Sequence, residues 1–302
     1  MAELAVQIVT YNSASDIEAC LEALRDADLD MEIHVWDNAS RDATVQTVRS
    51  HAEVSLHTSE INLGYCTANN RLLRKSTAEF VLFLNPDAQI GSRCLPRLLQ
   101  TLRESPQNTA AVGPKMLKPG GRVIDSAGID LTTSRLAPRD LGAGEIDRNQ
   151  YDTPGPSAGS SFACALWRRE AVEAVTLNDE FLDEDFFAYF EDVDVCRRAH
   201  RLGWSFLYEP RAVCEHRRGH PADHGPTLEA RAFVNRLLVF LVNENIRNNW
   251  LYLLFALPLE FARLVWRSVQ TPGFGVAWRM LVQSWPKARR KHRALSTAVS
   301  KI

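Results

Sequence analysis

Six carboxylates lie within the twelve residues from Asp183 to Asp194, and aromatic residues are interspersed among them. The acids are Asp183, Glu184, Asp185, Glu191, Asp192 and Asp194, and the aromatic residues are Phe181, Phe186, Phe187, Tyr189 and Phe190. The positive end of a helix dipole favours acids at a helix N-terminus, which explains one or two of them but not six. Aromatic residues beside carboxylates indicate a partly dry pocket, where the pKa of a carboxylate rises toward that of a useful base.

Helical spacing separates these acids onto two faces. Asp192 shares a face with Cys196, so its carboxylate can point inward as a proton acceptor. Glu191, Asp194 and Arg198 lie on another face, where a structural role is the alternative.

A second group of candidate residues follows the apolar run Phe80–Leu84, at Asn85-Pro86-Asp87. Proline has no N–H and cannot continue a central strand. A carboxylate directly after a buried strand is how an open α/β sheet presents a ligand site, and an ordinary turn is the alternative. His216 also ends a predicted strand. A His and a carboxylate from separate elements can bind one divalent ion, with phosphate oxygens and water completing the shell.

Polar side chains follow each of the four strands predicted in the first 90 residues. The four segments are Thr10-Tyr11-Asn12, Asp37-Asn38-Ala39-Ser40, Asn62-Leu63-Gly64 and Asn85-Pro86-Asp87. In a parallel sheet they lie at one edge, where they can enclose a nucleotide, with Gly64 allowing close approach. Ordinary polar loops and helix caps are the alternative. Neither G-x-G-x-x-G nor G-x-x-x-x-G-K-[ST] occurs, so a dinucleotide-binding motif and a P-loop are not supported.

The elements that must position these residues alternate in type. Apolar runs predict strands over 4–9, 31–36, 54–57 and 80–84, with a helix in each interval. This alternation predicts a parallel, doubly wound α/β sheet. We expect Ser13 or Ser15 to cap the first helix and Ser40 to cap the second.

After residue 90 the pattern changes. We expect helices over 98–102, 168–175 and 192–202, strands over 110–112, 162–167, 204–208 and 212–215, and a hairpin over 116–131. Gly203 suits the end of the helix before it. The polar loops 135–157 and 217–226 are candidates to close over a ligand and exclude water.

The C-terminal quarter is basic. Residues 227–302 contain 12 Lys and Arg but 3 Asp and Glu, a charge of +9, whereas residues 1–226 carry −11. Predicted helices over 228–268 and 274–285 have apolar stripes with tryptophans and flanking basic residues, which suit an anionic membrane surface. Packing on the catalytic core or on a second subunit is the alternative. The longest apolar run, 250–259, falls short of the roughly 20 residues of a membrane span.

The totals describe an ordinary globular protein, with 302 residues, 45% of them hydrophobic and 24% charged. Six cysteines are scattered without a CxxC pair, which indicates reduced, structural thiols in the cytosol rather than disulfides or zinc ligands. No charged region followed by an apolar one opens the chain, so we expect no signal peptide.

Six motifs follow one another in an order found in a known family. They are I-V-T-Y-N at 8–12, W-D-N-A-S-R-D at 36–42, N-L-G-Y-C-T-A-N-N at 62–70, L-N-P-D-A at 84–88, Y-F-E-D-V-D-V-C-R-R at 189–198 and G-W-S-F-L-Y-E-P-R-A-V-C-E-H at 203–216. Over about residues 4–220 the chain thereby resembles the family 2 glycosyltransferases of the rhamnosyltransferase-like branch. The resemblance implies a GT-A type α/β fold, a Rossmann-like, mostly parallel sheet flanked by helices, with a C-terminal helical extension.

The resemblance also implies a division of the chain. A GT-A catalytic domain spans 1–226, with a nucleotide-binding half over 1–90 and an acceptor and catalytic half over 91–226. A basic amphipathic helical tail follows over 227–302.

The implied reaction is sugar transfer from a nucleotide-diphosphate sugar with inversion at the anomeric carbon. Asp192 matches the family's general base in a motif that begins at Glu191. Asp87 matches the last acid of the DxD-type motif, which binds Mg²⁺ or Mn²⁺, and His216 matches a position that completes the metal or diphosphate site. Asn85 replaces the first acid of that motif, which leaves one protein carboxylate for the metal. The implied nucleotide-sugar-binding residues are Thr10, Tyr11, Asn12, Asp37, Asn38, Asn62, Gly64, Asn69 and Asn85.

The family branch favours dTDP-rhamnose as the sugar donor, with UDP- and GDP-sugars open, and a lipid-linked or polysaccharide acceptor. We expect a cytoplasmic protein, peripheral at the inner face of the cell membrane, that can form homo-oligomers and has no nucleic-acid partner. A sugar nucleotidyltransferase is one alternative, but it normally needs a basic residue in the first strand and loop, and Lys and Arg are absent from 4–24. A non-catalytic module that binds sugar or lipid is the other.

Overall fold

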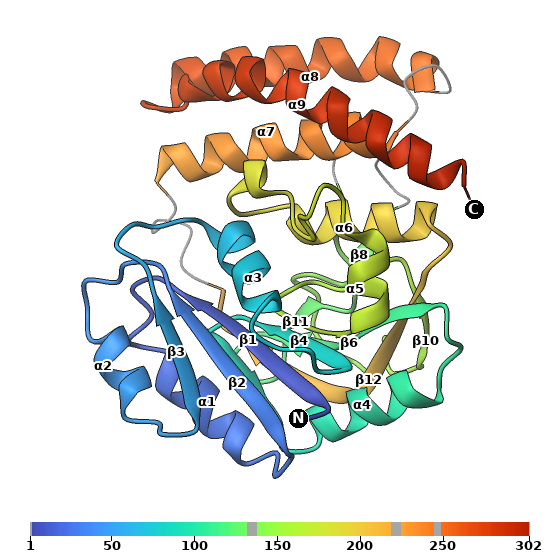
Figure 1. Ribbon diagram of the computed structural model, residues 1–302. Helices are drawn as coiled ribbons and strands as arrows, with labels where there is room; N and C mark the ends of the chain where they lie inside the picture. The colour runs from blue at the N-terminus through green and yellow to red at the C-terminus, as the bar shows by residue number, and fades with distance from the viewer. Residues whose placement is uncertain (1, 132–137, 219–224, 245–248, 302) are drawn as a thin grey trace.

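The computed structural model describes residues 2–131, 138–218, 225–244 and 249–301. Parts of the predicted loops 135–157 and 217–226 and of the predicted helix 228–268 lie outside these ranges. The centre of the protein is a sheet of ten strands with helices on both faces (Figure 1). Eight of the strands follow the order β10-β12-β6-β11-β4-β1-β2-β3, while β5 pairs with β12 and β7 pairs with β6.

The first 90 residues form the parallel half of the sheet. Its strands are β1 (Leu4–Thr10), β2 (Met31–Asp37), β3 (Val54–Thr58) and β4 (Phe80–Leu84), and its helices are α1 (Ile17–Arg25), α2 (Thr44–Arg49) and α3 (Tyr65–Leu73). β1 pairs in parallel with both β2 and β4, and β2 pairs in parallel with β3. The predicted alternation of strands and helices is confirmed. One face of the sheet packs with the apolar residues of α1 and α2 in one core, whereas the buried residues of α3 lie in clusters on the other face.

The second half of the sheet is mixed. Its elements are β5 (Ala88–Ile90), α4 (Cys94–Glu104), β6 (Thr109–Leu117), β7 (Ile124–Ser126), β8 (Ile129–Asp130), β9 (Arg139–Asp140), β10 (Gly155–Ser157), β11 (Cys164–Arg168), α5 (Arg169–Val175), the 3₁₀-helix η1 (Glu184–Phe186), α6 (Glu191–Arg201) and β12 (Ser205–His216). β11 runs antiparallel between β4 and β6, whereas β12 pairs in parallel with β6. The sheet is therefore mostly parallel where the first polar strand ends lie.

Several predictions about local structure were wrong. The two strands predicted over 204–208 and 212–215 are one strand, β12, whose register shifts between Glu209 and Val213. A bulge at this position accommodates Pro210, which cannot donate to the ladder. The polar segment 135–157 contains β9 and β10 and is only partly a loop. The predicted hairpin over 116–131 is confirmed for β6 and β7, but residues 129–130 pair with β9 instead.

The expected serine caps are also wrong. α1 has no side-chain cap, and Ser13 instead accepts hydrogen bonds from two backbone N–H groups through its carbonyl oxygen. α2 begins only at Thr44, whose N–H donates to Asp42 Oδ1 at 3.0 Å. The hydroxyl of Ser40 accepts the N–H of Asn12 at 2.8 Å. The N–H of Ser13 donates to Thr44 Oγ1 at 2.8 Å, so both serines join the segment after β1 to the segment after β2.

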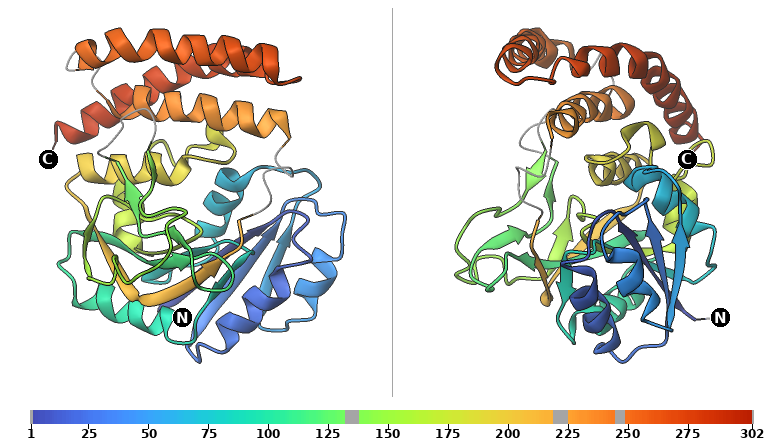
Figure 2. Two further views of the ribbon diagram at one scale, coloured as in Figure 1. Left: turned by 180° about the vertical axis from the view of Figure 1, so that it is seen from behind. Right: turned by 90° about the vertical axis from the view of Figure 1, so that its left-hand side faces the viewer.

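Three helices cover one side of the protein beyond α6. They are α7 (Pro226–Asn243), α8 (Trp250–Gln270) and α9 (Val276–Val299). The helix predicted over 228–268 is thus two helices, and the amphipathic segment over 274–285 is part of a longer one. α7 lies next to α6, and α8 lies farthest from the sheet (Figures 1 and 2). In the part of the chain that the structure describes, no helix is long and apolar enough to cross a membrane.

An aromatic cluster joins residues 183–194, which we call the acidic segment, to the sheet. The ring of Phe83 on β4 stacks with Phe162 at 4.6 Å and with Phe181 at 5.5 Å between centroids. Trp167 of β11 meets Phe181 edge-on at 5.3 Å. Phe181 therefore fixes the start of the acidic segment against the end of β4.

All six cysteines are free and buried, as predicted.

Candidate active site

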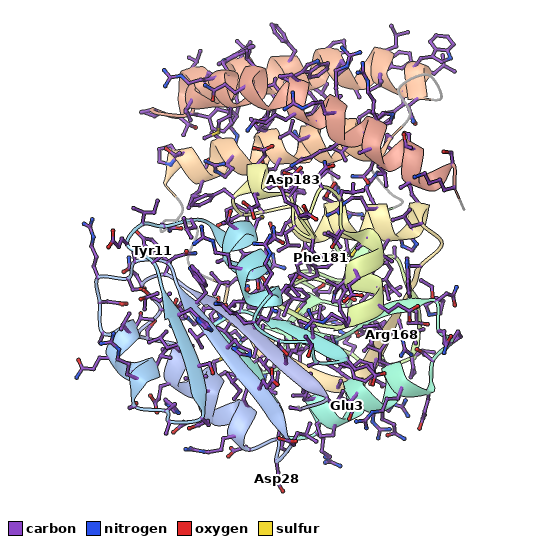
Figure 3. The ribbon with its side chains drawn as sticks, in the orientation of Figure 1. Glu3, Tyr11, Asp28, Arg168, Phe181 and Asp183 are labelled. Carbon is purple, nitrogen blue, oxygen red and sulfur yellow. The ribbon has the colours of Figure 1, made fainter. Side chains whose placement is uncertain are left out.

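The carboxyl ends of the parallel strands form one rim of the sheet. Figure 3 shows Tyr11 at this rim and Glu3 and Asp28 at the opposite end of the sheet. The Tyr11 side chain is 51% exposed, so its ring is available to a ligand. The polar segments predicted from the sequence thus lie at a common edge, because β1 to β4 all run in the same direction.

Asp37 is a buried carboxylate at this rim, only 1% exposed. It accepts hydrogen bonds from the hydroxyl of Thr10 and from the backbone N–H of Ser40, both at 2.9 Å. Two donors on separate loops hold the carboxylate in one orientation. Thr10, itself fully buried, therefore positions Asp37 and does not face solvent.

Three asparagines connect the neighbouring loops. The side chain of Asn38 donates to the carbonyl oxygen of Gly64 and accepts the N–H of Leu63, both at 3.2 Å. Asn62 Oδ1 accepts the N–H of Gly64 at 2.8 Å. Asn12 has a positive φ of 52° and accepts a backbone N–H from the loop after β2 at 2.9 Å. These side chains fix the shape of the rim.

Gly64 has a packing role that the sequence did not reveal. Its φ is +84°, and a Cβ at this position would lie 2.5 Å from Phe187 Cδ2. The nearby N–H of Cys66 donates to the carbonyl oxygen of Phe187 at 3.1 Å. Gly64 therefore lets the start of α3 approach the acidic segment closely. Asn69, also predicted at the site, is buried in α3 and donates to the carbonyl oxygen of Tyr65 at 3.1 Å.

The loop before α6 has a strained backbone. Phe187, Tyr189 and Phe190 have φ values of 64°, 73° and 68°, in the left-handed region that non-glycine residues seldom adopt. Each such residue costs about 1–3 kcal/mol, so surrounding contacts must hold the loop. Asn235 of α7 supplies these contacts by donating to the carbonyl oxygens of Phe186, Ala188 and Tyr189, at 2.9–3.0 Å.

Glu191 and Asp192 are the first two residues of α6, directly after this strained loop. Burial raises the pKa of both carboxyl groups, and the charge of Asp192 raises that of Glu191 further. Asp140 also raises the pKa of Asp192, while a hydrogen bond from the N–H of Val193, at 2.8 Å to Oδ1, lowers it. Both side chains are partly buried, and Asp192 has the raised pKa that a proton acceptor needs.

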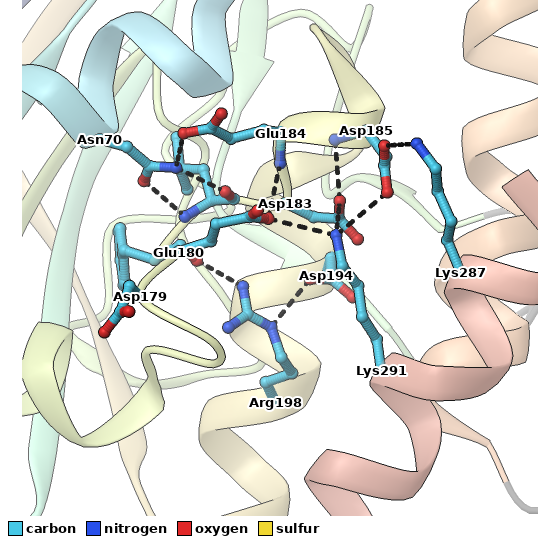
Figure 4. Close-up of polar contacts among 12 residues, drawn as sticks. Asn70, Asp179, Glu180, Asp183, Glu184, Asp185, Asp194, Arg198, Lys287 and Lys291 are labelled. Atoms are coloured by element: carbon cyan, nitrogen blue, oxygen red, sulfur yellow. Dashed lines mark hydrogen bonds and ion pairs between the residues drawn. The ribbon is translucent and has the colours of Figure 1, made fainter.

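The other acids of the segment have structural partners. Asp194 forms a buried ion pair with Arg198, Oδ2 to Nε 2.8 Å. Lys291 of α9 contacts Asp183 and Asp185, as Figure 4 shows. Burial raises the pKa of Asp183 to about 6, although Lys291 lowers it. Glu184 accepts a hydrogen bond from Asn70 Nδ2 at 3.1 Å and Asp185 also pairs with Lys287.

Asp87 and His216 meet beside the end of β4. His216 Nε2 lies 3.3 Å from Asp87 Oδ1, and its Nδ1 lies 2.9 Å from Oδ2 of Asp125 on β7. Burial alone would lower the pKa of His216, but the hydrogen bonds to Asp125 and Asp87 raise it to about 9. Burial alone would raise the pKa of Asp87, yet the bond to His216 makes the net shift downward.

A carboxylate oxygen of Asp87 and the neutral imidazole of His216 fit a divalent ion, so binding of the ion requires that His216 release a proton. Asp125 holds one imidazole nitrogen and directs the other toward Asp87, which is the arrangement of a histidine ligand oriented by a carboxylate. Within the described ranges, no three His, Cys, Asp or Glu side chains are grouped to hold a metal ion. Phosphate and water oxygens would therefore have to complete the shell. Asn85 anchors this turn through its N–H, 3.0 Å from the carbonyl oxygen of Ala163.

Arg218 connects the two carboxylate groups of the site. Its Nε lies 2.7 Å from Asp125 Oδ1, and its Nη2 pairs with Asp140. Its charge also lowers the pKa of Asp192. A continuous series of charged groups thus leads from Asp87 through His216 to the surroundings of Asp192.

Four residues of this arrangement were not predicted from the sequence: Asp125, Asp140, Arg218 and Asn235. Arg218 lies two positions after His216, and this was the one available signal. The others lie in segments without a motif, and only tertiary contacts bring them to the site.

A model of the family described as Glycosyl transferase family 2 matches residues 5–176. The N-acetylglucosaminyl-diphospho-decaprenol L-rhamnosyltransferase of Mycobacterium tuberculosis (strain ATCC 25618 / H37Rv) is 28% identical over 265 residues, covering 80% of this chain and 85% of that protein. The low-salt glycan biosynthesis hexosyltransferase Agl10 of Haloferax volcanii is 27% identical over 203 residues, covering 66% of this chain and 62% of that protein.

Solved structures share the fold. The mannosyltransferase PcManGT from Pyrobaculum calidifontis, in complex with GDP-Man and Mn²⁺, has a TM-score of 0.58 at 19% identity and covers 99% of this chain and 86% of that one. GalNAc-T7 with UDP, GalNAc and Mn²⁺ has a TM-score of 0.62 at 13% identity and covers 100% of this chain and 56% of that one. The predicted GT-A type fold is confirmed.

Proposed function

The chain belongs to glycosyl transferase family 2 and is a glycosyltransferase of the GT-A type, and on that premise we propose the reaction and the role of each site residue. The enzyme transfers a sugar from a nucleotide-diphosphate donor to an acceptor hydroxyl, with inversion at the anomeric carbon. The acceptor oxygen forms a bond to that carbon as the bond to the diphosphate breaks. The diphosphate leaves with the electron pair, and the hydroxyl proton passes to the enzyme.

Asp192 is the proton acceptor in this proposal. The observation that carries it is the environment of this carboxylate: it lies at the start of α6 after a strained loop, and burial raises its pKa. A carboxylate with a raised pKa accepts a proton more readily than an ordinary aspartate does. Burial and the charge of Asp192 raise the pKa of Glu191 beside it to about 8.

Asp87 and His216 hold Mg²⁺ or Mn²⁺ in this proposal, and Asp125 orients His216. When bound, the ion neutralises charge that develops on the leaving diphosphate. Mn²⁺ in the PcManGT and GalNAc-T7 structures supports a divalent ion. Asn85 replaces a second acid, so the protein supplies one carboxylate ligand.

The rim of β1 to β4 binds the nucleotide in this proposal. Tyr11 is exposed and can stack on the base, and Asp37 is oriented to accept hydrogen bonds from it. Thr10, Asn12, Asn38, Asn62, Gly64 and Asn69 shape the rim, as their hydrogen bonds indicate. The donor in this proposal is dTDP-rhamnose, and the acceptor is lipid-linked or a polysaccharide. The name of the mycobacterial relative supports the transfer of rhamnose to a lipid-linked acceptor.

We place the enzyme in the cytoplasm, peripheral at the inner face of the cell membrane, where a lipid-linked acceptor would lie. Residues 1–226 form its catalytic domain, with the nucleotide half over 1–90, and residues 227–302 form the basic tail.

A thermal-shift panel tests the donor and the metal together. dTDP-rhamnose with Mn²⁺ should stabilise the protein more than UDP- or GDP-sugars do, and more than dTDP-rhamnose without Mn²⁺. A transfer assay should then release nucleoside diphosphate. Release of pyrophosphate would instead indicate a nucleotidyltransferase, and no metal-dependent turnover of any donor would indicate a module that only binds sugar or lipid.

A further inference from the structure

α8 exposes apolar residues on most of its surface. Its large apolar side chains that are at least half exposed are Trp250, Leu251, Leu254, Phe255, Leu257, Leu259, Phe261, Trp266 and Val269. Helices on the surface of a globular protein normally turn such residues toward the core. An exposed apolar face of this size indicates an interaction surface.

The buried side of α8 carries the acidic residue of the helix, whereas a surface helix normally exposes its charged residues. Its three buried residues are Leu253, Glu260 and Leu264. Glu260, only 6% exposed, pairs with Arg236 of α7 and with Arg263, Oε1 to Nη1 2.7 Å. The acid of this helix therefore faces the protein together with Leu253 and Leu264, while most of its aromatic and aliphatic residues face outward.

α9 continues the same surface. Phe261 of α8 meets Trp278 of α9 edge-on at 5.7 Å between ring centroids. From Trp278 an exposed stripe runs at helical spacing along α9. Its members are Trp278, Val282, Trp285, Arg289 and Arg293, and Arg279 and Arg290 flank it. The apolar surface thus passes into a basic one, and we define both together as the α8–α9 face.

The charge of these helices is one-sided. Residues 249–301 contain nine Lys and Arg and one acid, Glu260. Lys287 and Lys291 turn inward to the acidic segment. For Arg279, Arg289, Arg290 and Arg293 the described residues offer no carboxylate within ion-pair distance. Their charge is available to an external anionic surface.

We propose that the α8–α9 face binds an anionic lipid bilayer, with the apolar residues in the interface and the arginines at the lipid phosphates. Tryptophans and arginines together with exposed aliphatic residues match the composition of helices that lie in a membrane interface. A second copy of the chain fits less well, because a two-fold contact would bring like charges together. This proposal rests on the proposed function in one respect: a lipid-linked acceptor lies in a membrane, and the α8–α9 face is the surface through which the enzyme reaches it.

The bound enzyme has a defined orientation. α9 contacts the acidic segment through Lys287 and Lys291, and α7 holds the loop before α6 through Asn235. The surface that meets the lipid is therefore connected by short contacts to the helix that carries Asp192. The bilayer fixes the height of the active site above the lipid headgroups.

Vesicle sedimentation tests the proposal with the full chain, without sugar donor or metal. The protein should bind vesicles of phosphatidylcholine with phosphatidylglycerol and bind pure phosphatidylcholine at least tenfold more weakly. Changing Arg279, Arg289, Arg290 and Arg293 to Gln should weaken binding more than about a hundredfold, because each basic residue near an anionic surface contributes about fivefold. The control changes Arg49, Arg93, Arg122 and Arg148 to Gln, which removes the same charge from exposed positions of the core and should leave binding within about threefold.

A second variant tests the apolar part. Leu254→Ser, Phe255→Ser and Val269→Ser together should weaken binding at least a hundredfold, since each buried side chain contributes about tenfold. These side chains are exposed, so the thermal midpoint should not change. Unchanged vesicle binding of either variant would overturn the proposal, as would a dimer in light scattering that the apolar variant dissociates. Donor binding and transfer are measured on the same proteins: loss of vesicle binding alone leaves the proposed function intact, and absence of transfer by a protein that binds vesicles contradicts the function alone.

Discussion

Five of the six carboxylates of the acidic segment fall into two sets with different surroundings, while the sixth, Glu184, accepts a hydrogen bond from Asn70. Asp183, Asp185 and Asp194 contact cationic side chains from α6 and α9. Glu191 and Asp192 have no Lys, Arg or His within ion-pair distance in the described part of the chain, and burial raises the pKa of both. The carboxylates of the first set form ion pairs that hold α6 and α9 in place. The second set retains the ability to take up a proton, so pairing, and not acid density, distinguishes a structural from a chemical role.

The largest expected effect is that of Asp192→Asn on transfer. Removal of a general base lowers the rate by about 10²–10⁴-fold, while the binding constant of the sugar donor should stay within about twofold. Steady-state transfer and donor titration measure both quantities. Asp185→Asn, which removes a paired carboxylate from the same segment, should keep transfer within a few-fold. Wild-type transfer by Asp192→Asn would refute the assignment of the base.

The largest loss of stability among these carboxylates is expected when Asp194 is replaced. Asp194→Asn leaves Arg198 buried without its carboxylate partner, and breaking a buried pair in this way costs about 3–5 kcal/mol of unfolding free energy. Asp192→Asn should not lower the free energy of unfolding at pH 7.5. The pKa of Asp192 is raised in the folded protein, so above that pKa its ionised carboxylate destabilises the fold. Asparagine carries no charge and removes this destabilisation. Denaturant unfolding of both variants checks this contrast. Equal losses of stability would remove the distinction between the two sets.

Asp125 tests whether a paired carboxylate can also serve the reaction, because it pairs with His216, which we propose as a metal ligand. Asp125→Asn should weaken Mn²⁺ binding in the presence of nucleoside diphosphate by about 10–100-fold, since His216 loses the partner that orients it. Calorimetric titration of the metal measures this without any turnover. An unchanged metal affinity would show that pairing with Asp125 is structural only.

The smallest effect concerns pH. Transfer requires ionised Asp192, so kcat/KM should fall about tenfold per pH unit below a midpoint that lies well above the ~4 of an ordinary aspartate. Asp140→Asn should move this midpoint to lower pH, because the charge of Asp140 raises the pKa of Asp192. Rate profiles of the wild type and of Asp140→Asn between pH 4.5 and 8 measure both midpoints. A midpoint that does not move in Asp140→Asn would contradict the electrostatic coupling.

The first half of the protein could be predicted from its sequence because its signals are local. Each of β1 to β4 is an apolar run that ends in a polar segment, and each helix between them has an apolar face at helical spacing. Parallel pairing then places Tyr11, Asp37 and Asp87 at one rim without further information. Gly203 likewise ends α6 with a φ of +83°, as a single local residue dictates.

The second half depended on contacts between distant segments. β11 enters the sheet antiparallel between β4 and β6, and no local pattern specifies this neighbour. The proline at 210 led us to predict two strands, but the register shift in β12 accommodates it within one strand. The serine caps failed for the same reason, because Ser40 bonds to a loop 28 residues away.

By itself the sequence determined the order of elements, the four polar strand ends and the presence of an acidic, aromatic segment with Asp192 at its helix. Burial and periodicity are properties of short stretches, so residue types and spacing are enough to specify them. Only the tertiary structure decided which of six carboxylates lack a cation, that Asp125 orients His216 beside Asp87, and that α8 turns its apolar residues outward. These outcomes depend on charges and surfaces that folding brings together from distant positions, such as Asp87 and His216, and no local pattern in the chain can encode them.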